Sequence, residues 1–454
     1  MGGFIAAKGP PGQGLRSIRV DVATAGHDAL DGVHDFIRRP LFAEVTAGTQ
    51  FQRAQREALF GVHAQYQYFA ARLALESTSL PGKREEAWRF TDLSLLTQIP
   101  PRPLEPAVGG TQTQTSPTAH SWRLLLNAWP EIGETSWPEG IEPLHGPELE
   151  AQLGRVLAAN ETTNHWSVLL NSAIAQPVVA LRIRPGVRTC LEVVSDSEER
   201  SGVQAHRLLL VLEEGACLDL LQVHQAGGPS LCSVVVEAQL GPHSTLRHGQ
   251  VTHGSNHGVL LAMTAVNQAP GSCYTLTSVG SGWGLARQEP VILQSEGQAT
   301  SQLRGLHWVR DHQISDTHSR VRFTGPEGQL DQVHKVVAEA EGRSVFNGCI
   351  QVPREAQRTK AAQLSRSLLL SDRARIDTKP ELEIVADDVR CTHGATISRL
   401  QQNELFYLQS RGIAAPQASR LLLRGFCEEI VSQLPSAAQS WSPLSSLLQE
   451  EARP

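Results

Sequence analysis

A spacing of roughly 27 to 30 residues recurs through the middle of this 454-residue chain and constrains its fold more than any other feature. At each step a turn is followed by a short strand-like run. The runs that we align begin at Thr189, Ala216, Ser244, Ser272, Ala299, Gln329 and Ala356. Repeats of this length are typical of solenoids, because one coil cannot bury its inward face alone and must stack on its neighbours. We therefore predict a parallel β-helix, and we expect Cys190, Cys217 and Cys273, which occupy one repeat position, to be small inward-facing side chains.

The composition agrees with stacked β-structure and narrows the class of protein. Aromatic residues make up 5% of the chain and charged residues 19%, and a thin core tolerates few aromatics. A net charge of −6 gives no reason to expect a nucleic-acid partner. The seven cysteines include no CxxC pair, which argues for a reducing compartment rather than a disulfide framework. No apolar run approaches the ~18 residues of a membrane span, so no membrane association is expected.

Helical patterns occur at both ends of the chain. Residues 22–79 carry apolar side chains at helical spacing, and a Pro-rich stretch at 100–121 reads as a linker. Helical spacing returns after Ala395, with Gly412 as an expected C-cap and Pro416 as an expected helix start. We expect the Ser-rich tail from residue 435 to be loosely held. The predicted organisation is an N-terminal helical region and linker at 1–110, a mixed connecting region at 111–174, a parallel β-helix core at 175–398 and a C-terminal helical domain at 399–454.

Several enzyme motifs are absent from the sequence. No GxxxxGK[ST] segment occurs, so we expect no ATP site in this chain. GxSxG, HExxH and CxxC are also missing, and no nucleophile–base pair stands out. The sequence therefore favours a scaffold over an enzyme. The alternative from another class is a β-helix enzyme acting on polysaccharide, for which Asp311, Asp316 and Asp331 are the nearest acidic candidates.

The stretch IVADDVRCTHGATISRL places Cys391 and His393 two residues apart, close to the end of the predicted β-helix. On a strand, residues i and i+2 face the same side, about 6 to 7 Å apart. Thiolate and imidazole together suit zinc or an iron–sulfur cluster. Two ligands are too few for a closed site, so further ligands would have to come from elsewhere, and packing against the core remains the alternative.

A second histidine-containing stretch is LHWVRDHQISDTHSR. His312 and His318 are six residues apart and would share a face with each other if one strand ran that far. We expect His307, His312 and His318 to lie on a solvated or interface-facing strand, with a metal site as the alternative.

Four segments of the chain resemble the SufD family of iron–sulfur cluster assembly proteins. They are RSVFNGCIQV (343–352), SLLLSDRARIDTKPELEIVADDVRCTHGAT (367–396), LFYLQSRGI (405–413) and, upstream, REEAWRFTDLSLL (84–96). Together these segments cover 62 residues, about a seventh of the chain. The related SufB pattern has an Asn-Thr-containing segment in place of Asp377-Thr378-Lys379-Pro380, His-Glu in place of His393-Gly394, and a cysteine in place of Leu408. All three differences favour SufD.

The resemblance implies a right-handed parallel β-helix between helical ends, in a non-catalytic scaffold that works with SufB and the ATPase SufC. It implies that His393 lies at the SufB interface and shares a transient Fe–S cluster with SufB, while Cys391 either backs the site or packs beneath it. Thr392 replaces the family's serine, a conservative change. The resemblance also implies that the C-terminal helices bind SufC. Two questions stay open: whether the complex binds a flavin, and whether this chain is a purely structural partner. The location implied is the cytoplasm or the plastid stroma. The residues expected at the partner interface are Leu405, Phe406, Tyr407, Leu421, Leu422 and Phe426.

Overall fold

The computed structural model describes residues 70–71, 73–75, 80–102, 104, 114–115, 122–126, 137–174 and 178–449. The expected helix within residues 22–79 and the expected linker at 100–121 lie mostly outside these ranges.

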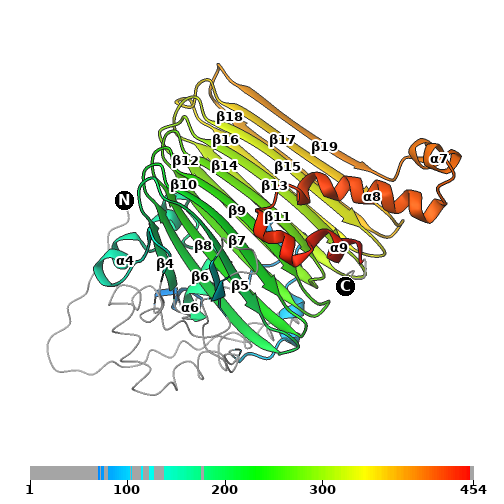
Figure 1. The fold of residues 1–454 in the computed structure, drawn as a ribbon, viewed down its shortest axis with the longest axis horizontal. Helices are drawn as coiled ribbons and strands as arrows, with labels where there is room; N and C mark the ends of the chain where they lie inside the picture. The colour runs from blue at the N-terminus through cyan, green and yellow to red at the C-terminus, as the bar shows by residue number, and fades with distance from the viewer. Residues whose placement is uncertain are drawn as a thin grey trace.

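The body of the protein is a solenoid of two stacked sheets (Figure 1). Successive strands alternate between the sheets, so that β4, β6 and β8 lie in a nine-stranded sheet and β5, β7 and β9 in a ten-stranded sheet. From β4 to β19 every neighbouring pair within a sheet is parallel, and the sixteen strands make eight coils of two strands each. The predicted parallel β-helix, mainly β with helical ends, is confirmed.

The elements have the following bounds. The solenoid strands are β4 (Val178–Ile183), β5 (Arg188–Asp196), β6 (Gly202–Leu212), β7 (Cys217–Gln225), β8 (Ser230–Leu240), β9 (Thr245–His253), β10 (Val259–Gln268), β11 (Cys273–Ser281), β12 (Leu285–Gln294), β13 (Thr300–Val309), β14 (Ile314–Phe323), β15 (Gln329–Ala338), β16 (Arg343–Val352), β17 (Lys360–Leu369), β18 (Arg375–Ile384) and β19 (Arg390–Ser398). Before them come η1 (Glu86–Trp88), η2 (Ser94–Gln98), β1 (Gln114–Thr115), β2 (Trp122–Leu125), β3 (Ile141–Pro143), α4 (Gly146–Gln152), α5 (Arg155–Ala159) and α6 (Trp166–Ile174). After them come α7 (Gln402–Ser410), α8 (Ala415–Val431), η3 (Ser436–Trp441) and α9 (Pro443–Leu448).

The core is built from columns of inward-facing side chains, one from each coil. Leu218, Leu246 and Tyr274 occupy matching positions on β7, β9 and β11, and each is fully buried. Alternation along a strand sends every second residue inward, so each coil buries its apolar face only against the coils above and below. Of the seven runs aligned from the sequence, four match the strand register of the structure. They are the runs that begin at Ala216, Ser244, Ser272 and Ala299.

The expectation for the three cysteines is wrong. Cys217 and Cys273 do share a column, but they alternate with core residues such as Leu218 and therefore face outward. Cys190 lies in a different column, opposite Asp219. The sequence alignment is two residues out of register in the first coil. A shift of two residues preserves the inward–outward alternation along the strand but places Cys190 in a different column.

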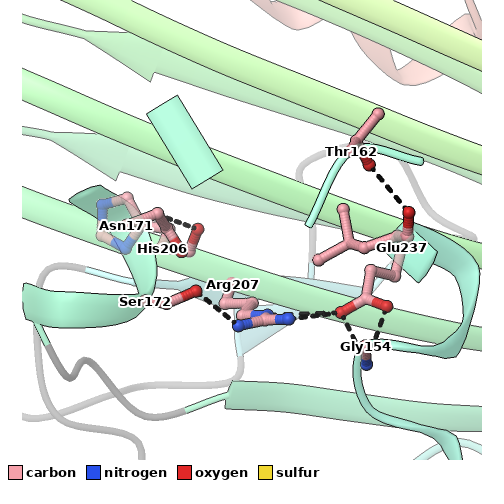
Figure 2. Close-up of polar contacts among 8 residues, drawn as sticks. Gly154, Thr162, Asn171, Ser172, His206, Arg207 and Glu237 are labelled. Atoms are coloured by element: carbon pink, nitrogen blue, oxygen red, sulfur yellow. Dashed lines mark hydrogen bonds and ion pairs between the residues drawn. The ribbon is translucent and has the colours of Figure 1, made fainter. Parts of the chain in front are cut away.

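The short helices α5 and α6 cover the outer face of the nine-stranded sheet and are fixed there by a buried ion pair (Figure 2). The Glu237 carboxylate on β8 accepts hydrogen bonds from Arg207 at 2.7 Å and from the Gly154 backbone N–H at 2.9 Å. Arg207 also donates to the Ser172 hydroxyl at 3.0 Å. The charge of Glu237 is thus fully paired although its side chain has no exposed surface.

A second buried network holds the upstream segment Glu86–Gln98 on the same sheet. Arg287 on β12 is 1% exposed and donates to Asp316 at 2.5 Å, to Glu289 at 2.9 Å and to the Ala87 carbonyl at 2.9 Å. Its guanidinium lies over the Trp88 ring, 3.8 Å from the ring centre. Thr91 donates a hydrogen bond to Asp316. Ala87, Trp88 and Thr91, which belong to the REEAWRFTDLSLL segment, therefore hold this segment on the solenoid.

The C-terminal helices pack on the outer face of the ten-stranded sheet (Figure 1). Lys335 on β15 is 1% exposed, and its ammonium donates to the Phe426 carbonyl at 2.8 Å and to Glu429 at 2.6 Å. The tail beyond α8, as far as residue 449, is not loose as expected. It forms η3 and α9, whose residues Ala438 and Leu447 are buried against the sheet. Apolar residues between the serines, rather than the serine content, decide its position.

Candidate functional site at the end of the solenoid

The solenoid ends in a terminal coil made of β18 and β19. Among the strands that the structure describes, β18 pairs only with β16 and β19 only with β17. Each therefore presents one unpaired edge of backbone N–H and C=O groups, a template for pairing with another chain. Figure 1 shows both strands at the same end of the stack.

Cys391 and His393 lie on β19 at positions that face into the solenoid. Cys391 is in register with Ala361 and His393 with Gln363, and both of these β17 residues are buried. Cys391 packs against the interior core and is half-buried, whereas His393 is exposed because no further coil covers it. Burial raises the pKa of the Cys391 thiol above its ordinary value, an effect that a hydrogen bond with the Ala361 backbone partly offsets. The structure thus brings the two side chains to one face but gives them different access to solvent.

The described part of the chain contains no group of three or more His, Cys, Asp or Glu side chains arranged to hold a metal ion. Cys391 and His393 are accordingly at most an incomplete ligand set. Neutral imidazole and thiolate both suit iron, but further donors are needed to complete a site.

Polar side chains line the interior directly below His393. Gln363 donates from its amide nitrogen to Gln332 at 3.0 Å, and Gln332 donates to the Ser319 hydroxyl at 2.8 Å. Deeper in the stack, His307 and His334 are stacked with ring centres 5.4 Å apart. Burial lowers the pKa of His307 to about 4 and holds the pKa of His334 well below its ordinary value. These interior imidazoles are therefore neutral near pH 7.

The rim of the terminal coil carries exposed apolar side chains. Ile384, Val385 and Ile397 are 40%, 59% and 43% exposed. They are among the few large apolar residues that the described ranges leave uncovered. Clusters of this kind on an otherwise polar surface mark sites of protein contact.

A second exposed apolar surface lies on α7, which Figure 1 shows beyond the edge of the stacked strands, and on the outer side of α8, which packs on the ten-stranded sheet. Phe406 and Tyr407 on α7 are 71% and 58% exposed, and Leu421 on α8 is 48% exposed. Leu405 and Leu422 are half-buried. Phe426 belongs to a different surface, because its ring packs on the sheet with the Lys335 ammonium 4.3 Å from its centre. It anchors α8 on the solenoid.

Among the described residues, His307, His312 and His318 do not come together in a metal site. His307 is 2% exposed and points into the core, so the expectation of a solvated strand is wrong for it. His312 lies in the turn before β14, facing Glu341, and shares no strand with His318. His318 contacts the buried Asp316 at 2.9 Å. A tight turn at residues 311–312, in which Asp311 has a φ of 47°, lies between the strand that carries His307 and the strand that carries His318.

The acidic residues considered for a polysaccharide enzyme are also apart. Asp316 faces outward from the nine-stranded sheet and is sealed in the Arg287 network. Asp331 lies on the ten-stranded sheet and pairs with Arg304. A glycosidase needs two carboxyl groups flanking one bond, within about 10 Å of each other. Asp residues on opposite sheets do not offer this arrangement.

Two groups of residues are not predicted from the sequence: Arg287 with its carboxylates, and Lys335 with Glu429. Charged residues within apolar strands were the available signal. Glu429 lies 94 positions from Lys335, and the Ala87 carbonyl lies 200 positions from Arg287, so register and helix docking had to be known first.

The described residues thus form a β-solenoid whose open last coil carries one thiol and one imidazole on the same strand face. Comparison with known families agrees: the model of the SUF system FeS cluster assembly SufBD core domain matches residues 193–426. The chain belongs to the SufBD family of iron–sulfur cluster assembly proteins.

Three relatives illustrate the breadth of this similarity. The chain is 33% identical over 392 residues to the iron-sulfur cluster assembly SufBD family protein slr0076 of Synechocystis, a match covering 80% of this chain and 86% of the relative. It is 29% identical to the chloroplastic protein ABCI7 of Arabidopsis thaliana, with 80% and 81% covered. It is 26% identical to the iron-sulfur cluster assembly protein SufD of Escherichia coli, with 79% and 86% covered. Within the described residues, no helix combines the length and apolar character needed to cross a membrane.

Proposed function

We propose that this chain is a non-catalytic scaffold subunit that pairs with a SufB-type subunit through its terminal coil and supplies His393 as a ligand to a nascent iron–sulfur cluster. The observation that carries the proposal is the position of His393: an inward-facing place on the last strand, yet exposed. In a longer solenoid this ring would be covered by another coil. Here a second protein can take that place.

The edge of β19 supports an interface formed by strand pairing. An added strand from the partner would satisfy the unpaired backbone groups and cover Ile397, and a strand beside β18 would cover Ile384. The ligands that His393 lacks would then come from the partner. Cys391 either backs the site or packs under it, and its raised thiol pKa favours packing.

The cluster is the cargo of this scaffold. A neutral imidazole nitrogen binds iron, and a site with few protein thiolates releases a cluster more readily than a closed four-cysteine site. The role of this chain would be to orient one nitrogen ligand at a shielded interface and to exclude competing ligands. Sulfide and iron delivery would depend on the partners.

We further propose that α7 and α8 bind an ATPase of the SufC type through Phe406, Tyr407 and Leu421. The ammonium of Lys335 fixes α8 to β15, and β15 lies two strands from β19 in the same sheet. A pull on the helix pair would therefore be applied close to the terminal coil. Nucleotide-driven movement of the ATPase could then shift the equilibrium between closed and open packings of the interface.

The test is replacement of His393 by alanine, with the chain coexpressed with its SufB-type and SufC-type partners. The purified complex is assayed for iron and acid-labile sulfide, and its assembly is checked by size-exclusion chromatography. H312A is the matched control, because His312 is exposed but lies in a turn away from the terminal coil. We expect H393A to assemble normally and to lose most of its iron and sulfide, while H312A retains both.

The outcomes separate the alternatives. Normal iron and sulfide in an intact H393A complex would mean that this chain is a purely structural partner. Loss of the complex itself in H393A would place His393 in subunit binding rather than in cluster ligation.

A further inference from the structure

The side-chain amide of Gln363 is buried, and one of its two polar atoms makes no hydrogen bond with the described residues. Its side chain is 2% exposed. The amide nitrogen donates to Gln332 at 3.0 Å, which leaves the amide oxygen without a partner among the described residues. A buried acceptor without a donor is costly, so such an atom calls for a specific explanation.

The orientation of this amide is fixed from below. Gln332 accepts from Gln363 through its own oxygen and donates from its nitrogen to the Ser319 hydroxyl at 2.8 Å. A flip of the Gln363 amide would set two oxygens against each other. The carbonyl end of Gln363 is thus the end left free.

Space for this amide is provided by a glycine on the opposite sheet. A Cβ added to Gly348 would lie 2.2 Å from the Gln363 nitrogen. Any other residue at 348 would therefore displace the amide. The observed position of the Gln363 amide therefore requires a glycine at position 348.

His393 is the register partner of Gln363 on β19. Neighbouring parallel strands lie about 4.8 Å apart, and both side chains point to the inner face, so they are adjacent. No hydrogen bond joins them in the structure. Rotation of the exposed imidazole about its side-chain bonds brings a ring nitrogen towards the free amide oxygen.

We propose that the Gln363 oxygen accepts a hydrogen bond from one ring N–H of His393 and so fixes the tautomer whose other nitrogen is unprotonated and faces out of the open end. Gln363 is then a positioning residue for the iron ligand, a role that rests on the proposed function of His393. Histidines that bind metals commonly donate their second nitrogen to such an acceptor, which sets ring orientation and raises ligand basicity.

The test reads the tautomer in the isolated, iron-free chain. The protein is labelled with ¹⁵N-histidine, and the ring nitrogen shifts of His393, assigned by their loss in H393A, are recorded at pH 8. We expect one tautomer to dominate the other at least tenfold in the unchanged chain. Q363L should abolish this bias, and Q332L should weaken it by freeing the amide to flip.

S367A is the matched control. Ser367 lies on the same strand, faces inward, is 2% exposed and has a hydroxyl without a partner, but its register partner is Ile397. Its removal should leave the His393 signals unchanged. Identical ring shifts in the unchanged chain and in both folded variants, Q363L and Q332L, would overturn the proposal.

The two proposals can fail separately. If the tautomer depends on Gln363 but the H393A complex keeps its iron, the hydrogen bond stands and the cluster role falls. If H393A loses iron while Q363L leaves the ring signals unchanged, the positioning role alone falls.

Discussion

Replacing Arg287 by methionine removes the cation that holds the upstream segment Glu86–Gln98 on the solenoid. Asp316 is 0% exposed and Glu289 7% exposed, so both carboxylates would be left buried without their counter-ion. Burial alone would raise the pKa of Asp316, but Arg287 holds it below its ordinary value, and the same holds for Glu289. Arg287 is the largest of the groups that keep both carboxylates charged in the native state.

The size of the effect follows from these contacts. Removing one partner of a buried ion pair costs about 3 to 5 kcal/mol. The stacking of Arg287 on Trp88 and its bond to the Ala87 carbonyl would be lost as well, which places the expected loss in the upper part of this range. With 1.36 kcal/mol for each factor of ten, hydrogen exchange in the segment should accelerate by at least about 10²-fold.

The assay is hydrogen exchange followed by mass spectrometry at pH 7. The amides of Arg89, Thr91 and Leu96 are hydrogen-bonded within the segment and report its release. R247M is the control, since Arg247 is 54% exposed and pairs with Asp219 on the outer face; an exposed pair contributes about 1 kcal/mol or less. Exchange in R287M no faster than in R247M would refute the assignment of this network as the anchor.

Three further predictions follow from the same contacts. K335M should weaken the attachment of α8 by about 1.5 to 3 kcal/mol through loss of a charged hydrogen bond, seen as faster exchange in α8; unchanged exchange would contradict it. A double change of Phe406 and Tyr407 to serine should leave the melting temperature unchanged but lower affinity for a SufC-type partner at least tenfold in calorimetry, whereas equal affinity would exclude this surface. The unfolding free energy should fall as the pH drops from about 6.5 towards 4, by up to about 1.4 kcal/mol per pH unit for each inward-facing histidine that burial keeps neutral, and urea midpoints equal at pH 7 and pH 5 would contradict this. The sign follows because the unfolded chain binds protons below its histidine pKa of about 6.5, while burial lowers the native pKa values to about 3 or 4. These histidines are His206, His224, His248 and His307.

The solenoid could be predicted from sequence because its repeat is a property of local patterns. A turn, a short apolar run and a step of about 28 residues are visible without knowing any partner. The column of a given residue was less secure. Cys190 was placed beside Cys217 because adjacent columns on one face differ by only two residues, and nothing local distinguishes them.

The terminal coil was predictable in part. The i, i+2 spacing of Cys391 and His393 correctly put them on one strand face. The sequence does not show that this face is the inner one, or that His393 is nonetheless exposed. Both depend on where the stack ends. Gln363 could not have been linked to His393 from sequence, since the connection is a register across 30 residues. Long-range docking, such as Lys335 on α8, was likewise invisible because it depends on the final path of the C-terminal helices.

The most direct test of the central claim is pulsed electron paramagnetic resonance of the reduced cluster in the assembled complex, with ¹⁵N-histidine incorporated only into this chain. We expect a ¹⁵N hyperfine coupling of the size that a directly bound imidazole gives, present in the unchanged complex and in H312A and absent from H393A. A cluster that forms in the unchanged complex without any such coupling would contradict it.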